Sequence, residues 1–158
     1  MRLPVELRHV APRLATGAFI LNSGLAKRGA DEESAAMMHG MAKNTYPFLG
    51  KLQPTTFVRL LSAGEIALGT ALLLPVVPTA LAGIGLTAFS AGLVGLYLRT
   101  PGMRQEGSLR PTQEGTALAK DTWMLGIGVG FVVDAATSRS RRPRPAWKSA
   151  AALTTRCR

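Results

Sequence analysis

The chain has 158 residues, 47% of them hydrophobic, and a formal net charge of +10 at pH 7. This length fits one domain, and the apolar content with 17 glycines is typical of a small membrane protein, where small residues let helices approach closely. The single cysteine, Cys157, excludes an intrachain disulfide, a CxxC redox motif and a thiolate zinc site.

The positive charge is concentrated at the C-terminal end. Seven of the 19 basic residues follow Ser138, in a stretch without acidic residues: Arg139, Arg141, Arg142, Arg144, Lys148, Arg156 and Arg158. Such runs bind anionic lipid or fix membrane topology as readily as they bind RNA, and the only aromatic residue among them is Trp147. The pattern disfavours a nucleic-acid partner, and we predict that residues 137–158 form a basic, disordered cytoplasmic tail.

The first predicted span runs from Pro12 to about Lys27 and is the least apolar of four. Residues 1–11 are a short basic lead whose prolines and charges do not fit a cleavable signal peptide, so we expect this span to be retained. Residues 28–54 are polar, and within them Ala35–Ala42 predicts a short amphipathic helix. We expect that helix to lie at the membrane interface.

The most informative segment runs from Ile66 to Leu98 without a charged side chain and contains Pro75 and Pro78 near its middle. One helix of that length would be about 50 Å long, far more than the roughly 30 Å hydrocarbon core. Prolines three residues apart would also free backbone groups that lipid cannot satisfy. The segment therefore predicts a helical hairpin, with spans over Phe57–Leu74 and Thr79–Leu98.

A fourth helix is predicted from Pro111 to about Ala136. The chain is thus expected to be all-α, an integral membrane four-helix bundle over residues 1–136 with a short interfacial helix between spans 1 and 2. An even number of spans places both termini on one side of the membrane. The dense basic tail favours the cytoplasmic side of a bacterial inner membrane.

The hairpin takes Glu65 into the membrane, where a carboxylate is costly and needs a partner. Glu65 lies about 12 Å from the start of its span at 1.5 Å per residue, and Lys120 and Asp121 lie at a similar depth in the fourth helix. The first span ends on the same side, which brings Asn22 and Lys27 to this layer. We therefore predict a cluster of Glu65, Lys120, Asp121, Lys27 and Asn22.

Two interpretations of this cluster stay open. It is either a structural network of ion pairs or a polar pocket for a headgroup, a quinone or a proton. Glycines beside it, Gly64 and Gly69 in the second span and Gly126-x3-Gly130 in the fourth, are expected to let those two helices approach closely.

Two further groups of residues have weaker signals. Arg13 and Asp134 lie at the opposite membrane face, either as an ion pair or, as we favour, as two interface residues with hydrated charges. His39 lies among methionines that suit a soft metal, but methionines at helical spacing more often form an apolar face, so we predict no metal site. The methionines are Met37, Met38 and Met41.

Several of these residues together resemble the DoxX family of small four-helix bacterial membrane proteins. The resemblance rests on Arg13-x3-Gly17, Asn22-x-Gly24-x2-Lys27, Gly64-Glu65-x3-Gly69 and Lys120-Asp121, in this order over residues 12–136. Some members are associated with thiosulfate:quinone oxidoreductase or with redox-stress complexes. The absence of a cysteine pair argues against dithiol chemistry.

We therefore expect an accessory membrane subunit that supports a redox or quinone-linked complex and has no catalytic activity of its own. Its expected partners are the lipid bilayer and membrane-associated redox proteins, with a quinone as the one candidate cofactor. The alternatives are a quinone-linked oxidoreductase subunit, in which Glu65 or Asp121 moves protons, and a transporter of a small solute or lipid.

Overall fold

A computed structural model describes residues 5–140, and the regular secondary structure in this range is helical. The predicted cytoplasmic tail therefore lies almost wholly outside the described residues. The helices are α1 (Leu7–Lys27), α2 (Glu32–Thr45), the 3₁₀ helix η1 (Pro47–Lys51), α3 (Pro54–Leu73), α4 (Thr79–Arg99), α5 (Thr116–Ala119) and α6 (Asp121–Ser140).

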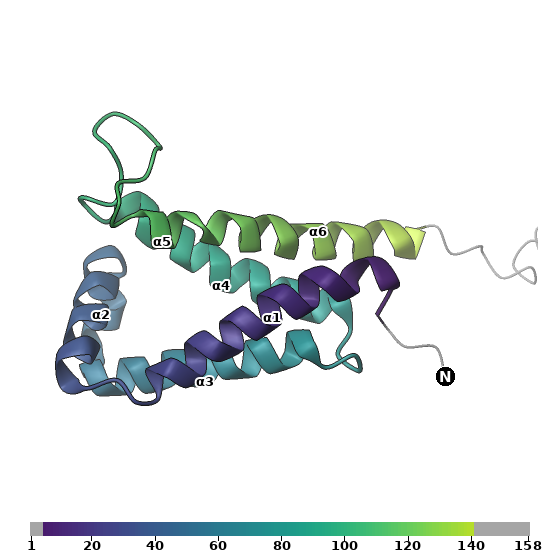
Figure 1. The fold of residues 1–158 in the computed structure, drawn as a ribbon, viewed down its shortest axis with the longest axis horizontal. Coiled ribbons are helices and arrows are strands. Elements are labelled where there is room, and N and C mark those ends of the chain that lie inside the picture. The colour runs from purple at the N-terminus through teal and green to yellow at the C-terminus, as the bar shows by residue number, and fades with distance from the viewer. Residues whose placement is uncertain (1–4, 141–158) are drawn as a thin grey trace, which may run out of the picture.

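The long helices pack as two pairs, α1 with α3 and α4 with α6 (Figure 1). The tight turn between α3 and α4 joins the pairs at one end, where the start of α1 and the end of α6 also lie. At the other end α2 lies across the ends of the pairs and contacts both α3 and α4. The molecule thus has a closed end and an end bridged by α2.

Glycine makes the contact within the first pair close. A Cβ added to Gly69 of α3 would lie 2.6 Å from the backbone nitrogen of Leu21, and one added to Gly24 of α1 would lie 2.9 Å from the backbone nitrogen of Ile66. Beside Gly24, the Ser62 hydroxyl donates a 2.7 Å hydrogen bond to the Gly24 carbonyl. Small residues let backbones approach in this way without a side chain between them.

The second and fourth spans were expected to approach each other closely, but α3 packs against α1 and α6 packs against α4. A Cβ on Gly128 of α6 would lie 2.7 Å from the Thr87 hydroxyl of α4, whereas Gly64, Gly126 and Gly130 have no such neighbour within 4 Å. Gly126-x3-Gly130 therefore does not lie in the α4–α6 contact. The helical rotation that decides which glycine faces a neighbour depends on tertiary packing, and the expectation was wrong for that reason.

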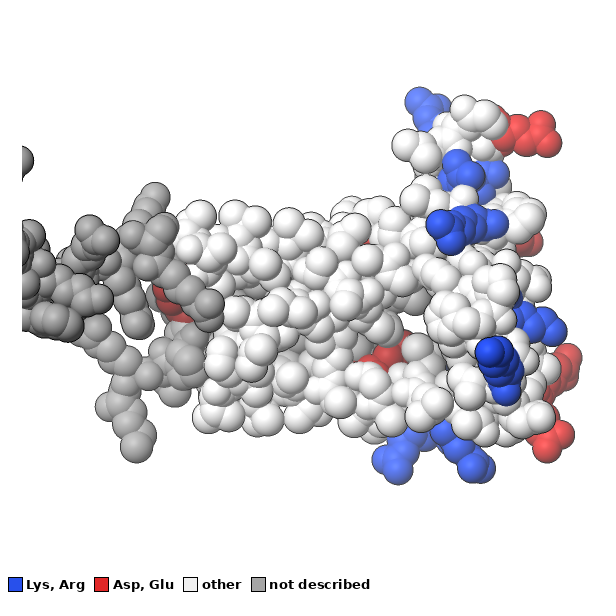
Figure 2. Space-filling view, turned by 180° about the vertical axis from the view of Figure 1, so that it is seen from behind, with Lys and Arg blue, Asp and Glu red and all other residues white. Residues whose placement is uncertain are grey.

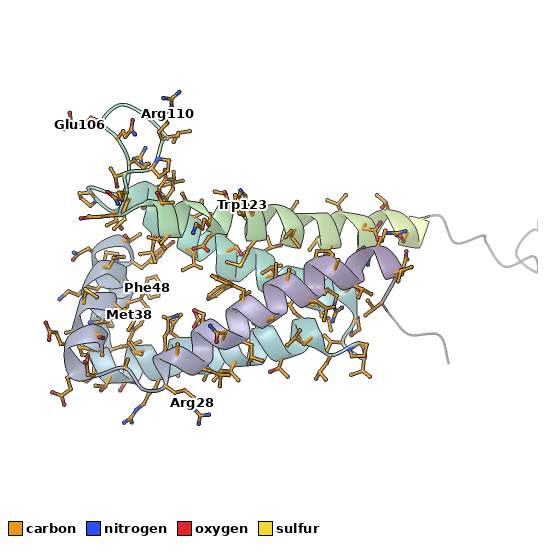
Figure 3. All side chains as sticks on the ribbon, viewed as in Figure 1. Arg28, Met38, Phe48, Glu106, Arg110 and Trp123 are labelled. Carbon is orange, nitrogen blue, oxygen red and sulfur yellow. The ribbon has the colours of Figure 1, made fainter. Side chains whose placement is uncertain are left out.

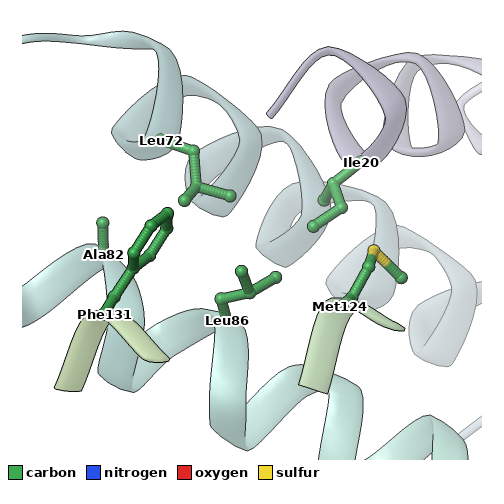
Figure 4. Packing of buried hydrophobic residues seen from close by; sticks show 6 residues of the cluster. All are labelled: Ile20, Leu72, Ala82, Leu86, Met124 and Phe131. Carbon is green, nitrogen blue, oxygen red and sulfur yellow. The ribbon is translucent and has the colours of Figure 1, made fainter. Parts of the chain in front are cut away.

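Apolar side chains from both pairs meet between them, as Figure 4 shows. The buried cluster takes one residue from α1, one from α3, two from α4 and two from α6: Ile20, Leu72, Ala82, Leu86, Met124 and Phe131. Because each pair supplies part of this cluster, the two pairs share one hydrophobic core.

Helix α2 is capped at its N-terminus and is joined to α4 near its C-terminus. Asp31 caps its N-terminus by accepting a 2.8 Å hydrogen bond from the Ser34 backbone nitrogen, and this bond lowers the pKa of Asp31. At the other end of α2, the Tyr46 hydroxyl donates a 2.8 Å hydrogen bond to the Gly92 carbonyl of α4. The predicted helix Ala35–Ala42 is therefore present and extends further in both directions.

Three helical segments in residues 5–140 are long and apolar enough to cross a membrane: Pro54–Leu73, Thr79–Arg99 and Thr116–Ser138. Figure 2 shows charged side chains gathered at the end bridged by α2, beside a flank with few of them. These features indicate a membrane protein. α1 is not among the three, because residues such as Arg13, Asn22 and Lys27 lower its hydropathy.

Two predicted helix starts were wrong. The first helix begins at Leu7, five residues before Pro12, which lies inside α1. The last helical segment begins at Thr116, not Pro111, because Pro111 pairs with Arg104 in a short antiparallel bridge of the preceding loop. Gly102 and Gly107 adopt positive φ angles in this loop, which glycine tolerates without strain.

The close contact at Gly69 leads to a prediction. Gly69→Ala should lower the free energy of unfolding by about 1–3 kcal/mol, because the new methyl group meets the backbone of α1. Thermal unfolding in mild detergent measures the effect. Gly64→Ala, on the same helix with nothing within 4 Å, is the matched control and should be neutral or stabilising by up to about 1 kcal/mol. Equal melting temperatures for the two variants would contradict the described α1–α3 contact.

Candidate functional site

A cavity of about 350 Å³ lies between the two helix pairs, beside α2. Figure 3 shows Met38, one of its lining residues, on α2. The cavity has a polar wall from α1, α3 and the start of α6. Its apolar wall includes three phenylalanines and four methionines: Phe19, Phe57, Phe89, Met37, Met38, Met41 and Met124.

The polar wall is built on the ion pair of Lys27 with Glu65. The Lys27 ammonium lies 3.0 and 2.9 Å from the two oxygens of the Glu65 carboxylate, whose residue is 4% exposed. The same ammonium donates a 2.7 Å hydrogen bond to the Ser23 hydroxyl, one helical turn earlier on α1. Pairing with hydrogen bonds on both partners is what makes a buried charge tolerable.

Asp121 lies in the same wall without such a partner. It is 7% exposed and lines the cavity at the first residue of α6. Its carboxylate interacts electrostatically with Glu65 and Lys27, but within residues 5–140 its side chain has no hydrogen bond or ion pair. The wall therefore holds one carboxylate in an ion pair, that of Glu65, and one outside any ion pair among the described residues, that of Asp121.

The cavity reaches the surface between α1 and α2. Two of its lining side chains are mostly exposed, Phe19 of α1 at 62% and Met37 of α2 at 67%. The remaining apolar lining comes from all six α-helices. A cavity of this size with an apolar lining and a few polar groups is typical of binding sites for small molecules.

The structure brings together three of the five residues of the predicted cluster. Lys27, Glu65 and Asp121 line the cavity, whereas Lys120 and Asn22 are exposed and do not. Consecutive helical residues point about 100° apart, so Lys120 and Asn22 cannot share the direction of their neighbours Asp121 and Ser23. Ser23 was not among the predicted residues, although its spacing of four residues from Lys27 places both on one helix face.

The second predicted group is arranged differently from both expectations. Arg13 is only 2% exposed, and it makes no ion pair with Asp134. Its guanidinium instead donates hydrogen bonds to the carbonyls of Ala71, Leu72, Leu74 and Val77 and to the Thr79 hydroxyl, at distances of 2.8–3.1 Å. Asp134 accepts hydrogen bonds from Arg8. Arg13 therefore fixes the α3–α4 turn.

His39 does not face the cavity that the methionines line. Its Nε2 lies 3.0 Å from the Leu49 carbonyl, and its ring packs against Phe57. In the described part of the chain, histidine, cysteine and acidic side chains form no group that could hold a metal ion. His39 therefore connects α2 to η1 and α3.

Comparison with known proteins gives no relative: no family model, curated protein or solved structure matches the chain. The resemblance to the DoxX family stays a prediction from short motifs.

The buried ion pair leads to a second prediction. Lys27→Met should destabilise the protein by about 3 kcal/mol, because it leaves the Glu65 carboxylate buried without its cation. Adding Glu65→Met should restore most of that loss, since no unpaired charge remains. Thermal unfolding of the two singles and the double measures the coupling.

Lys120→Met is the control for removing a lysine, because Lys120 is exposed and lies outside the cavity. It should change stability by no more than about 0.5 kcal/mol. A double variant as unstable as the sum of its singles would contradict the pairing of Lys27 with Glu65.

Proposed function

We propose that the protein spans a membrane four times, with α1, α3, α4 and the continuous α5–α6 segment as its spans. The 20 residues of α3 correspond to about 30 Å of helix, the thickness of the hydrocarbon core. Three segments have the required apolarity. For α1, the support is its length of 21 residues and its close packing along α3.

We further propose that α2 lies at the membrane interface. Its buried face contains Ala35, His39 and Ala42, while Glu32, Glu33 and Lys43 are exposed. It also lies at the end of the molecule where charged side chains gather. An amphipathic helix at that position fits the boundary between headgroups and hydrocarbon.

The function that the site supports best is binding of a small amphiphilic molecule by an accessory membrane subunit. The observation that carries this proposal is the cavity itself, whose apolar lining adjoins a wall with three ionisable groups, Lys27, Glu65 and Asp121. An apolar body and a polar head would each find a matching surface there. The cavity opens beside Phe19 and Met37, where a molecule dissolved in lipid can enter from the side.

A redox or quinone-linked complex is the setting that the DoxX resemblance implies. A quinone is itself amphiphilic, so it fits the apolar lining of the cavity. We keep association with such a complex, in a bacterial inner membrane, as a proposal.

The four-span arrangement predicts the accessibility of single cysteines introduced into a Cys157→Ser background. Glu6→Cys and Val76→Cys should react with a membrane-impermeant thiol reagent from one side, and Gly29→Cys from the other, because α1 and α3 each cross once. Labelling of intact cells against inverted vesicles measures this, and the cytoplasmic location expected for the termini predicts protection of Glu6→Cys in intact cells. Reaction of Glu6→Cys and Gly29→Cys from the same side would show that α1 does not cross.

Quinone occupancy is tested with a tryptophan placed inside or outside the cavity. Leu61 lines the cavity, and Leu60 is exposed on the same helix. Protein purified in native lipid discs should hold more quinone per lipid than empty discs, and Leu61→Trp should remove this excess while Leu60→Trp keeps it. Quinone is measured by extraction and chromatography. Equal quinone in all samples would exclude it as the occupant, and proteins that remain bound to the discs would identify partners.

A further inference from the structure

The charged groups of the cavity do not balance. The lining contains one ammonium group, on Lys27, and two carboxylates, on Glu65 and Asp121. With all three ionised, the site carries a net charge of −1. An uncompensated charge in a site of low dielectric is unfavourable, so the cavity favours an occupant that brings a positive charge.

Asp121 is the group left to bind such an occupant. The Lys27 ammonium is already engaged by both oxygens of Glu65 and by the Ser23 hydroxyl. The Asp121 carboxylate lines the cavity at 7% exposure and has no side-chain hydrogen bond within the described part of the chain. The residues that the structure describes thus supply this carboxylate with no hydrogen-bond donor, and an ammonium group in the cavity would provide a charge-assisted one.

The rest of the lining suits a cation as well. Three aromatic rings, of Phe19, Phe57 and Phe89, border the cavity. The face of an aromatic ring carries a partial negative charge that attracts organic cations, and methionine sulfur is polarisable and adapts to irregular ligands. Lys27 is the only basic residue among the lining residues, and its ammonium group is already in an ion pair with Glu65.

We propose that the cavity binds the ammonium head of a lipophilic amine, with Asp121 as its carboxylate partner and the phenylalanines and methionines around its apolar part. This inference rests on the proposed function, because it assumes that the cavity is a binding site. It differs from the quinone of the previous subsection, since a neutral quinone would fill the apolar lining but leave the Asp121 charge unbalanced.

The test compares three probes with the same chain and different head groups: octylammonium, octanol and octanoate. The full-length protein in phosphatidylcholine nanodiscs is titrated by calorimetry at neutral pH, and titration of empty discs is subtracted to remove partition into lipid. Octylammonium should bind at least about tenfold more tightly than octanol, a difference of about 1.4 kcal/mol. Octanoate should bind most weakly. Equal affinities for octylammonium and octanol would overturn the proposal.

Asp121→Asn keeps the shape of the side chain and removes its charge. It should abolish the preference for octylammonium over octanol. Glu114→Gln is the matched control, because Glu114 is an exposed acid just before α5 that does not line the cavity. A preference that survives in Asp121→Asn would assign the cation to another group and overturn the role of Asp121.

The three probes decide the question even if Asp121→Asn does not fold, because they are compared in the unaltered protein. The failure of this inference is distinguishable from failure of the proposed function. Octanol or quinone binding without a preference for octylammonium overturns the inference and leaves the cavity as a binding site. No binding of any probe, together with no excess of quinone, overturns both.

Discussion

The guanidinium of Arg13 holds together the closed end of the molecule. The last carbonyls of any helix lack partners within the helix, and in lipid an unpaired carbonyl costs several kcal/mol. At the end of α3 the carbonyls of Ala71, Leu72 and Leu74, and in the following turn that of Val77, accept hydrogen bonds from this one side chain. The Thr79 hydroxyl at the start of α4 accepts as well. One residue of α1 thereby fixes the direction in which the chain leaves α3 and enters α4.

The cavity lies toward the opposite end of the molecule, beside α2. Near the turn the helices pack closely, with Gly17 of α1 against Leu72 and Leu73 of α3 and with Gly83 of α4 against Phe131 of α6. Toward α2 the space between the pairs is the cavity, which the charged groups border on one side. Charges in the middle of a packed core would be expensive, but a cavity that reaches the surface lets them keep part of their solvation.

The sequence predicted the hairpin because Pro75 and Pro78 are local signals that do not depend on the rest of the fold. It also predicted that Glu65 needs a partner, since the depth of a residue follows from its position in a span. Depth did not decide which side chains meet, because that depends on the rotation of each helix. Lys120 and Asp121 have nearly the same depth, yet only Asp121 lines the cavity.

The role of Arg13 was missed for a different reason. Its partners are backbone carbonyls, which every residue has, so no residue type in the sequence marks them. An arginine opposite an acid suggests an ion pair, and only the path of the turn shows that four carbonyls are within its reach. The helix pairing was missed similarly, because the sequence has glycines on several helix faces and tertiary packing selects Gly69 and Gly128 among them.

Helix α2 connects the two helix pairs at the end opposite the α3–α4 turn. It is attached to α4 through the Tyr46 hydroxyl at Gly92 and to the η1–α3 region through His39 at Leu49 and Phe57. It also supplies Met37, Met38 and Met41 to the cavity lining, while the ionisable side chains come from α1, α3 and α6. The methionines of α2 and the charged groups therefore lie in separate stretches of the chain. In the proposed binding site, a change in α2 would therefore alter the fit of the apolar part of a ligand and keep the charged groups as they are.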